Sequence, residues 1–310
     1  MIAVFRRGAD LLRPIPASRD SSVLHVGAEL ARSHNAREPS KLGPYKDKTP
    51  DPEVAPRLGR SKTAPLLILC ALALSPVLHA ADLLLTAATD AELQPLIKQL
   101  GGAHTETRAA WTFWLGTLGG KSVVLTRTEG DPLNAVAATT LAIRGYSPKL
   151  VVTYGSARAH DPALQPGDVV VSKTFVAFDG LVSDPLPLGA GVKPLTWQRL
   201  THAPMTPGEK EQYQDDFPAD ATALATAQKI KPARGKLVTG ALGSAYQVNR
   251  EADRIAWIHQ TWHTSSEDAE SAHIAGCAHL LGVPVIGIRV IEGTPAEAAA
   301  LAAQFLEEWK

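Results

Sequence analysis

The sequence has very little cysteine: Cys70 and Cys277 are the only two among 310 residues. Two cysteines cannot form a disulfide framework, and neither stands in a CxxC or Cys/His spacing of the kind that binds structural zinc. We therefore expect no metal and no cofactor held by cysteine. The composition is otherwise ordinary for a globular protein, with 45% hydrophobic and 20% charged residues.

Clustered positive charge is also lacking over most of the chain. Residues 1–80 carry 12 Lys and Arg against 7 Asp and Glu, which leaves 19 against 24 for residues 81–310. Because nucleic-acid binding depends on clustered Lys and Arg that neutralise phosphates, a mildly acidic body argues against a nucleic-acid partner.

No hydrophobic run reaches the roughly twenty residues of a membrane span. The longest covers about fifteen residues, 64–78, and contains Pro76. That length is too short for a stable membrane span. Arg57, Arg60 and Lys62 precede the run, and His79-Ala80-Ala81, with its two small residues, follows it. A basic, then apolar, then small-residue order is typical of a signal peptide, so residues 57–80 predict export to the periplasm or secretion, with no span after cleavage.

The segment before this signal lacks a sustained apolar period. Residues 1–56 are rich in Arg, Pro, Ser and Asp, a composition typical of disordered chain. A signal peptide normally begins a protein, and Met1 and Met205 are the only methionines. We therefore interpret residues 1–56 as disordered or as not translated, with initiation at a non-ATG codon near Val54 or Leu58.

Residues 81–310 alternate short apolar runs with helical patterns. Residues 83–87, 150–154 and 168–172 predict strands, and residues 90–100 and 134–144 predict helices. Residues 283–291 form a nearly continuous β-branched run, which is typical of a strand buried on both faces. The fold class we predict is α/β, a single domain with a central twisted mixed β-sheet flanked by helices.

Further patterns fill in this domain. The glycines of residues 116–120 predict a β-hairpin, and residues 251–260 and 267–281 predict helices. Thr294, Pro295 and Glu297 predict the start of a last helix through a capping box. Residues 180–218 hold six prolines and predict a long irregular insertion, typical of a lid or binding loop.

Three familiar site motifs fail on inspection. Residues 116–122 lack the first glycine of a phosphate-binding loop. His259 and His263 have zincin spacing without the intervening carboxylate, so we expect no metal site. Ser156 lacks the second glycine of a hydrolase nucleophile elbow, so a serine that positions a ligand is the better functional interpretation.

The carboxylates are more informative. Ligands of α/β sheets bind beyond the carboxyl ends of the strands. Glu92 follows the first strand, Glu270 stands near the start of a helix before the last strand, and Glu292 ends that strand. Each alone is a solvated residue by default, but all three occupy the ligand side of one predicted sheet.

These pieces together resemble the purine nucleoside phosphorylase and nucleosidase superfamily, especially the methylthioadenosine/S-adenosylhomocysteine nucleosidases. Residues 86–93 resemble its opening strand and G-A-M-E-E-E-V, and residues 152–157 resemble N-T-G-S-A. Residues 164–172 resemble L-x-x-G-D-I-V-V-S, residues 268–271 resemble E-M-E-A, and residues 289–293 resemble R-A-I-S-D. The resemblance covers nearly all of residues 81–310.

The resemblance implies hydrolysis of the N-ribosidic bond of a purine-type nucleoside. By position, Glu92 would activate the attacking water, Ser156 and Arg289 would fix it and its surroundings, and Glu270 would accept the ribose hydroxyls. Val248 and Ala269 would line the base. A homodimer, a small-molecule nucleoside partner and no cofactor are further implications.

The chain departs from the family pattern where the leaving base needs a proton. The family's acidic residue after the last strand corresponds to Gly293, so Glu292 is the remaining candidate for the acid. Glycines of the family correspond to Arg158 and Ala159. Loss of a general acid typically costs a factor of about 10² to 10⁴ in rate. The alternatives are therefore a non-catalytic nucleoside-binding or storage protein, and a nucleoside phosphorylase.

Overall fold

The computed structural model describes residues 80–205, 214 and 216–310. The segment expected to be disordered or untranslated, 1–56, and all but the last residue of the expected signal peptide, 57–80, lie outside the described residues. Among the helices that are described, none has both the length and the apolar character needed to cross a membrane.

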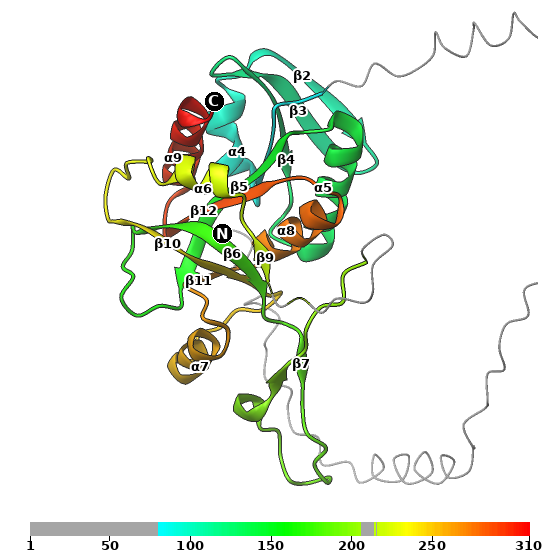
Figure 1. Ribbon diagram of the computed structural model, residues 1–310, viewed down its shortest axis with the longest axis vertical. Helices are drawn as coiled ribbons and strands as arrows, with labels where there is room; N and C mark the ends of the chain where they lie inside the picture. The colour runs from blue at the N-terminus through cyan, green and yellow to red at the C-terminus, as the bar shows by residue number, and fades with distance from the viewer. Residues whose placement is uncertain (1–79, 206–213, 215) are drawn as a thin grey trace, which may run out of the picture. The chain divides into compact units, whose positions relative to one another are not determined.

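Ten strands of the described chain form one mixed sheet, in the order β11-β10-β6-β12-β5-β1-β4-β3-β2 with β9 beside β6 (Figure 1). β1 pairs in parallel with β4 and β5, β12 pairs in parallel with β5, and β10 pairs in parallel with β6 and β11. β12 is antiparallel to β6, and β11 also pairs antiparallel with β5. The strands are β1 (Leu83–Ala87), β2 (Gly101–Arg108), β3 (Trp111–Leu118), β4 (Lys121–Arg127), β5 (Leu150–Ala159), β6 (Val169–Ala177), β9 (Phe217–Pro218), β10 (Leu237–Ser244), β11 (Ser266–Asp268) and β12 (Val285–Ile291).

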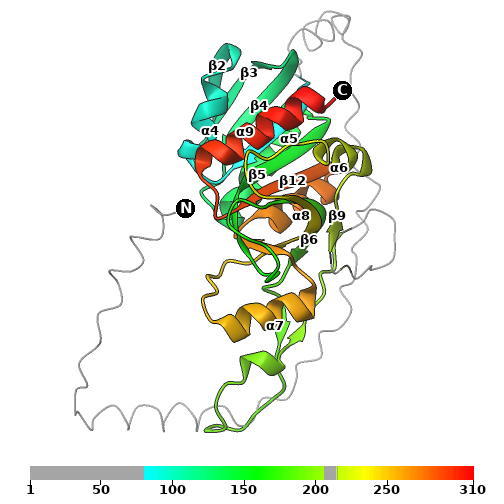
Figure 2. The same cartoon turned by 90° about the vertical axis from the view of Figure 1, so that its left-hand side faces the viewer.

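Helices cover both faces of this sheet. α4 (Asp90–Ile97), α6 (Ala221–Ala227) and α9 (Pro295–Glu308) contribute to one buried apolar cluster, and α4 packs beside α9 (Figure 2). α5 (Pro132–Tyr146) and α8 (Ser271–Leu280) contribute to a second cluster on the other face. α7 (Ala252–Trp262) packs on a small third cluster. The predicted α/β class, with a central mixed sheet between helices, is confirmed.

The central strands are apolar because they are covered on both sides. Leu83 and Leu85 of β1 lie in the first cluster and Leu84 lies in the second, so the run alternates between two cores. All seven residues of β12 are buried, as its β-branched run predicts. Arg289 is the charged exception within that strand, and its burial points to a specific role.

Turn and cap predictions are confirmed in detail. β3 and β4 form the expected hairpin, and Gly119 and Gly120 at its turn have φ of 57° and 76°, a region that favours glycine. Thr294 caps α9 through a complete capping box with Glu297.

One helix prediction was wrong at its start. Residues 267–281 were expected to be helical throughout, but Ser266–Asp268 form β11 and α8 begins only at Ser271. The physical reason is non-local: β11 pairs with β10 on one edge and with β5 on the other. β2, with its polar sequence, was not predicted at all.

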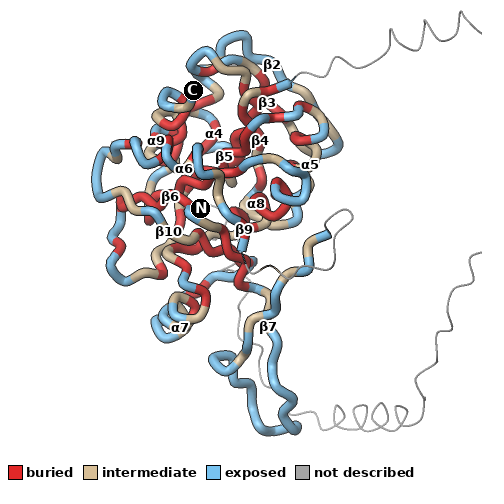
Figure 3. The backbone as a smooth tube through the Cα atoms, viewed as in Figure 1, coloured by how far each residue is buried: buried red, intermediate tan, exposed pale blue. Residues whose placement is uncertain are grey.

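The proline-rich segment carries only short elements. β7 (Leu181–Val182) pairs with β8 (Gln198–Arg199), and a 3₁₀ turn, η1, spans Pro194–Thr196. Most residues of this segment are exposed (Figure 3). Residues 206–213 and 215 of the predicted insertion lie outside the described residues.

Candidate functional site

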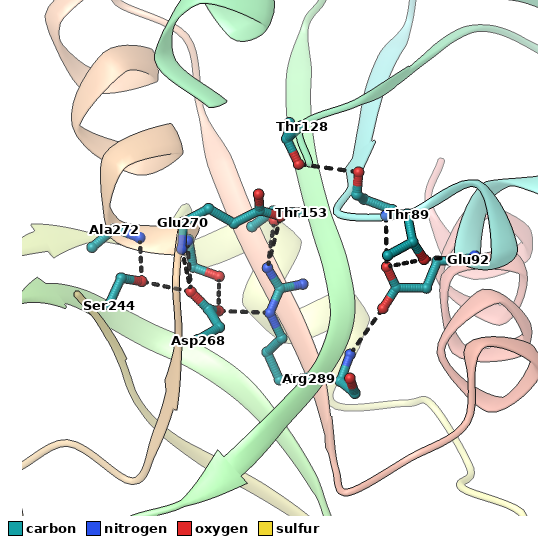
Figure 4. A network of polar contacts seen from close by, with 12 residues as sticks. Thr89, Glu92, Thr128, Thr153, Ser244, Asp268, Glu270, Ala272 and Arg289 are labelled. Carbon is teal, nitrogen blue, oxygen red and sulfur yellow. Dashed lines mark hydrogen bonds and ion pairs between the residues drawn. The ribbon is translucent and has the colours of Figure 1, made fainter. Parts of the chain in front are cut away.

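A buried ion pair stands at the centre of the site (Figure 4). Arg289 of β12 is 2% exposed, and its Nε donates to Asp268 Oδ2 at 2.7 Å. Its Nη2 donates to Thr153 Oγ1 of β5 at 2.9 Å. Nη1 of the same guanidinium is buried and has no hydrogen-bond partner in the described structure. The pair therefore joins three strands and leaves one donor unused.

Asp268 is anchored more fully than any other acid of the site. Its Oδ1 accepts from Ser244 Oγ at 2.7 Å and from the backbone nitrogens of Glu270 and Ser271 at 2.8 Å each, and its Oδ2 accepts from Ser271 Oγ. Burial by itself raises the pKa of Asp268, but the Arg289 charge and these hydrogen bonds outweigh it and lower the pKa. Asp268 is thus the ionised partner of Arg289.

Glu270 is buried in a different way. The residue is 2% exposed, its Oε1 lies 3.9 Å from Arg289 Nη2, and its Oε2 has no hydrogen-bond partner in the described structure. Burial raises the pKa of Glu270 to about 7, although Arg289 and the Thr128 hydroxyl lower it. Each unpartnered buried polar group costs about 1 to 3 kcal/mol. Glu270 Oε2 and Arg289 Nη1 are therefore an acceptor and a donor available to a ligand.

Glu92 approaches the same guanidinium from the first turn of α4. Thr89 caps this helix, and its backbone nitrogen and Oγ1 donate to Glu92 Oε2 at 3.1 and 3.0 Å. Glu92 Oε1 accepts from the backbone nitrogen of Ser156 at 3.3 Å. Glu92 is 4% exposed, and both of its carboxylate oxygens accept hydrogen bonds. The carboxylate is therefore held in one orientation.

Gly155 permits this close approach. A Cβ atom at this position would lie 2.9 Å from Glu92 Oε1 and 3.3 Å from Arg289 Nη1. Both charged groups therefore lie against the same stretch of β5 backbone, and the Glu92 charge helps to raise the pKa of Arg289 against the lowering effect of burial. A side chain at 155 would push the two groups apart.

The structure thus brings together Glu92, Ser156, Glu270 and Arg289, four of the residues singled out in the sequence. Ala269 is half-buried between the two acids of the β11–α8 junction, and Val248 is 39% exposed on the loop after β10. Glu292 is exposed with φ of 46°, and none of the side-chain hydrogen bonds or ion pairs among the described residues links it to this network. Its backbone nitrogen donates to Ala157.

Sequence reasoning missed three of the groups that support the site. Thr153 accepts a hydrogen bond from Arg289, and Ser244 donates one to Asp268. Asp268 itself was predicted to lie in a helix, and its ion pair with Arg289 was not predicted. A signal existed for Thr89, because Thr89-Asp-Ala-Glu92 is a capping-box sequence. No local pattern marks Thr153 or Ser244.

The described residues hold no cluster of three His, Cys, Asp or Glu side chains arranged for a metal ion. His259 Nδ1 contacts the backbone oxygen of Thr264 at 2.8 Å, and His263 ends α7 in a left-handed conformation. The charged side chains that meet at the site are three carboxylates and one guanidinium.

The two acids next to Arg289 should affect stability in opposite ways. Glu270 has a raised pKa, so its contribution to stability is full below about pH 4.5 and is lost as the pH rises through about 7. We expect Glu270→Gln to match the native free energy of unfolding at pH 4 and to exceed it at pH 8 by on the order of 3 kcal/mol. Urea unfolding at both pH values measures this.

The control is Asp268→Asn. Because the pKa of Asp268 is lowered, its contribution is present above the unfolded pKa of about 4 and is lost only as the pH falls below it. This variant leaves Arg289 unpaired and should lose about 3 to 5 kcal/mol at pH 8. A Glu270→Gln variant that is less stable than the native protein at pH 8 contradicts the assignment.

Comparisons with known proteins identify the family of the chain. The family model described as the phosphorylase superfamily matches residues 82–309. The 5'-methylthioadenosine/S-adenosylhomocysteine nucleosidase of Psychromonas ingrahamii is 29% identical over 209 residues, which cover 65% of this chain and 81% of that protein. A nucleosidase of the same name from Neisseria meningitidis, solved with methylthio-immucillin-A, has a TM-score of 0.61 at 19% identity and covers 73% of this chain and 99% of its own. Futalosine hydrolase of Helicobacter pylori has a TM-score of 0.59 at 16% identity, with 73% and 97% covered. The chain belongs to the phosphorylase superfamily.

Proposed function

We propose that this protein hydrolyses the N-ribosidic bond of a purine-type nucleoside. The observation that carries the proposal is the convergence of two buried acids, Glu92 and Glu270, on opposite sides of Arg289. Its relatives named as nucleosidases support the same reaction class.

Glu92 is the proposed base for the attacking water. Its carboxylate is oriented by Thr89 on one oxygen and by the Ser156 backbone on the other. A positioned carboxylate accepts a proton as the water oxygen bonds to C1' of the ribose, and such general-base assistance is worth a factor of about 10² to 10⁴.

Glu270 and Arg289 are the proposed ribose site. The buried Oε2 of Glu270 lacks a donor and the buried Nη1 of Arg289 lacks an acceptor within the described structure. A ribose hydroxyl both donates and accepts, so hydroxyls of one sugar can satisfy both groups. Because both are buried, satisfying them supplies affinity as well as orientation.

The charge balance favours water over phosphate as the nucleophile. Arg289 is the one cation in this network of described residues, and it already binds Asp268 and Thr153. Glu92, Asp268 and Glu270 surround it. An incoming phosphate would meet surplus negative charge, whereas an oxocarbenium-like transition state, which is positive, would be stabilised.

Two substitutions separate catalysis from binding. Glu92→Gln should lower kcat for release of free base from inosine, adenosine or methylthioadenosine by at least about 10² with little change in binding. Glu270→Ala should abolish nucleoside binding in a thermal-shift assay, because the ribose acceptor is gone. Unchanged affinity in Glu270→Ala would refute the ribose site.

A second candidate function is nucleoside binding without turnover. Gly293, which has no side chain to protonate a leaving base, favours it. Native protein that binds nucleosides but releases no base from any of them would support this candidate over hydrolysis.

We also propose that two copies associate through α5 and α8. Leu133 and Val136 of α5 and Leu280 of α8 are exposed, at 81%, 40% and 50%, and a cavity of about 300 Å³ lies between these helices and Phe217. Exposed apolar side chains beside a cavity support an interaction surface here. Sedimentation should show a dimer that Val136→Arg or Leu280→Arg converts to monomer, whereas Leu188→Arg on the β7–β8 segment should not; a native monomer would refute the proposal.

Export remains a proposal that depends on residues 57–80 alone. Their basic, apolar and small-residue order is that of a cleaved signal. The mature protein isolated from its native cell should begin near Ala81. An intact N-terminus upstream of Arg57 would contradict export by this signal.

A further inference from the structure

Position 293 cannot hold a proton donor without rearrangement. A Cβ atom on Gly293 would lie 2.8 Å from Val290 Cβ and 2.6 Å from its Cγ2. Real Cβ atoms do not approach so closely, so any side chain there requires Val290 to move. Val290 packs in the apolar cluster on the α4–α9 face, whereas its neighbour Arg289 points toward the site. Position 293 therefore lacks an acidic side chain, and the backbone there leaves no room for one.

The neighbouring titratable groups are engaged elsewhere. His160 is 3% exposed, and its two ring nitrogens contact Thr264 Oγ1 at 2.7 Å and Glu267 Oε2 at 3.0 Å. Glu267 is 5% exposed and also accepts from Asn249 Nδ2 at 2.6 Å. This cluster fixes the loop after β10 and has no proton directed to a ligand.

The remaining polar groups near that loop are poor acids or exposed. Arg158 donates to the backbone oxygen of Asn249 at 3.3 Å, and a guanidinium does not release its proton at neutral pH. Glu292 is exposed, and Tyr246 is 67% exposed. The family resemblance places the base at Val248 and Ala269, whose side chains are hydrocarbon and have no proton to donate. The base end of the site therefore lacks a built donor among the described residues.

The chemistry of the leaving group follows from this lack. A neutral purine leaves as an anion unless it is protonated. A base that already carries a fixed positive charge leaves as a neutral molecule: water bonds to C1', Glu92 takes the water proton, and both electrons of the C1'–N bond pass to the ring nitrogen and cancel its charge. The products are ribose, neutral base and one proton released to solvent.

The electrostatics of the site agree with a cation. Three buried carboxylates, on Glu92, Asp268 and Glu270, face the single guanidinium of Arg289. The buried network therefore holds more carboxyl groups than cations, and negative charge in a site of low dielectric attracts a cationic ligand more strongly than it would in water.

We propose that the substrates of this site are N-ribosides whose base carries a fixed positive charge, as in N7-alkylated purines, and this proposal rests on the proposed hydrolysis. Because no acid among the described residues is placed to protonate the base, the rate of cleavage depends directly on how readily the base leaves without a proton.

The test compares two substrates that differ by one methyl group. Guanosine and N7-methylguanosine are incubated with the full-length protein, and release of the free base is followed by chromatography. We expect kcat for N7-methylguanosine to exceed kcat for guanosine by at least about 10². The comparison uses kcat so that tighter binding of the cation does not account for the ratio.

Two variants show where the reaction occurs. Glu92→Gln should abolish cleavage of N7-methylguanosine, which places that reaction in the site described above, and Tyr246→Phe should leave the ratio unchanged. A smaller ratio in the native protein, or guanosine cleavage that falls in Tyr246→Phe, overturns the substrate class but leaves hydrolysis standing. Cleavage of neither compound overturns both proposals.

Discussion

The site depends on the buried ion pair between Arg289 and Asp268. Removing two charges from water costs several kcal/mol per ion, and such a cost is repaid only when the remaining donors and acceptors are satisfied. Ser244, Thr153 and the backbone nitrogens of Glu270 and Ser271 provide most of these hydrogen bonds, and Arg289 Nη1 is left without a partner in the described structure. Since these partners come from β10, β5 and the β11–α8 junction, the pair can form only when the sheet is assembled. Fold and site are therefore specified by the same contacts.

The position of Glu92 shows how tightly local structure and chemistry are joined. The same carboxylate completes the capping box of α4 and lies against the backbone of β5, where Gly155 leaves room for it beside Arg289. Both oxygens of Glu92 are thus held by parts of the fold itself, the cap of α4 and the backbone of β5. Orientation of a base in this way lowers the entropic cost of reaching the reactive geometry. The first turn of α4 is thus also part of the proposed reaction site.

Much of this could be predicted from the sequence, because several signals are local. The β-branched run of β12, the glycine turn between β3 and β4, and the capping box of α9 each lie within a few residues. β11 was mistaken for helix because its three residues are held by distant strands, and β2 was missed because its exposed sequence lacks an apolar pattern. The family resemblance indicated Glu92, Ser156, Glu270 and Arg289, but the hydroxyls of Thr153 and Ser244 have no local signature. Their importance comes only from what lies opposite them in the folded sheet.

The two acids beside Arg289 differ for a physical reason that bears on the chemistry. Asp268 takes the ion pair and nearly all of the local hydrogen-bond donors, which leaves Glu270 buried with a raised pKa of about 7 and an unpartnered oxygen. A group in that state gains from any ligand that supplies a hydroxyl donor or positive charge. A sugar supplies the first, and an oxocarbenium-like transition state or a cationic base supplies the second. The unequal sharing of one guanidinium between two carboxylates is thus the feature of the site on which the proposed preference for a positively charged riboside depends.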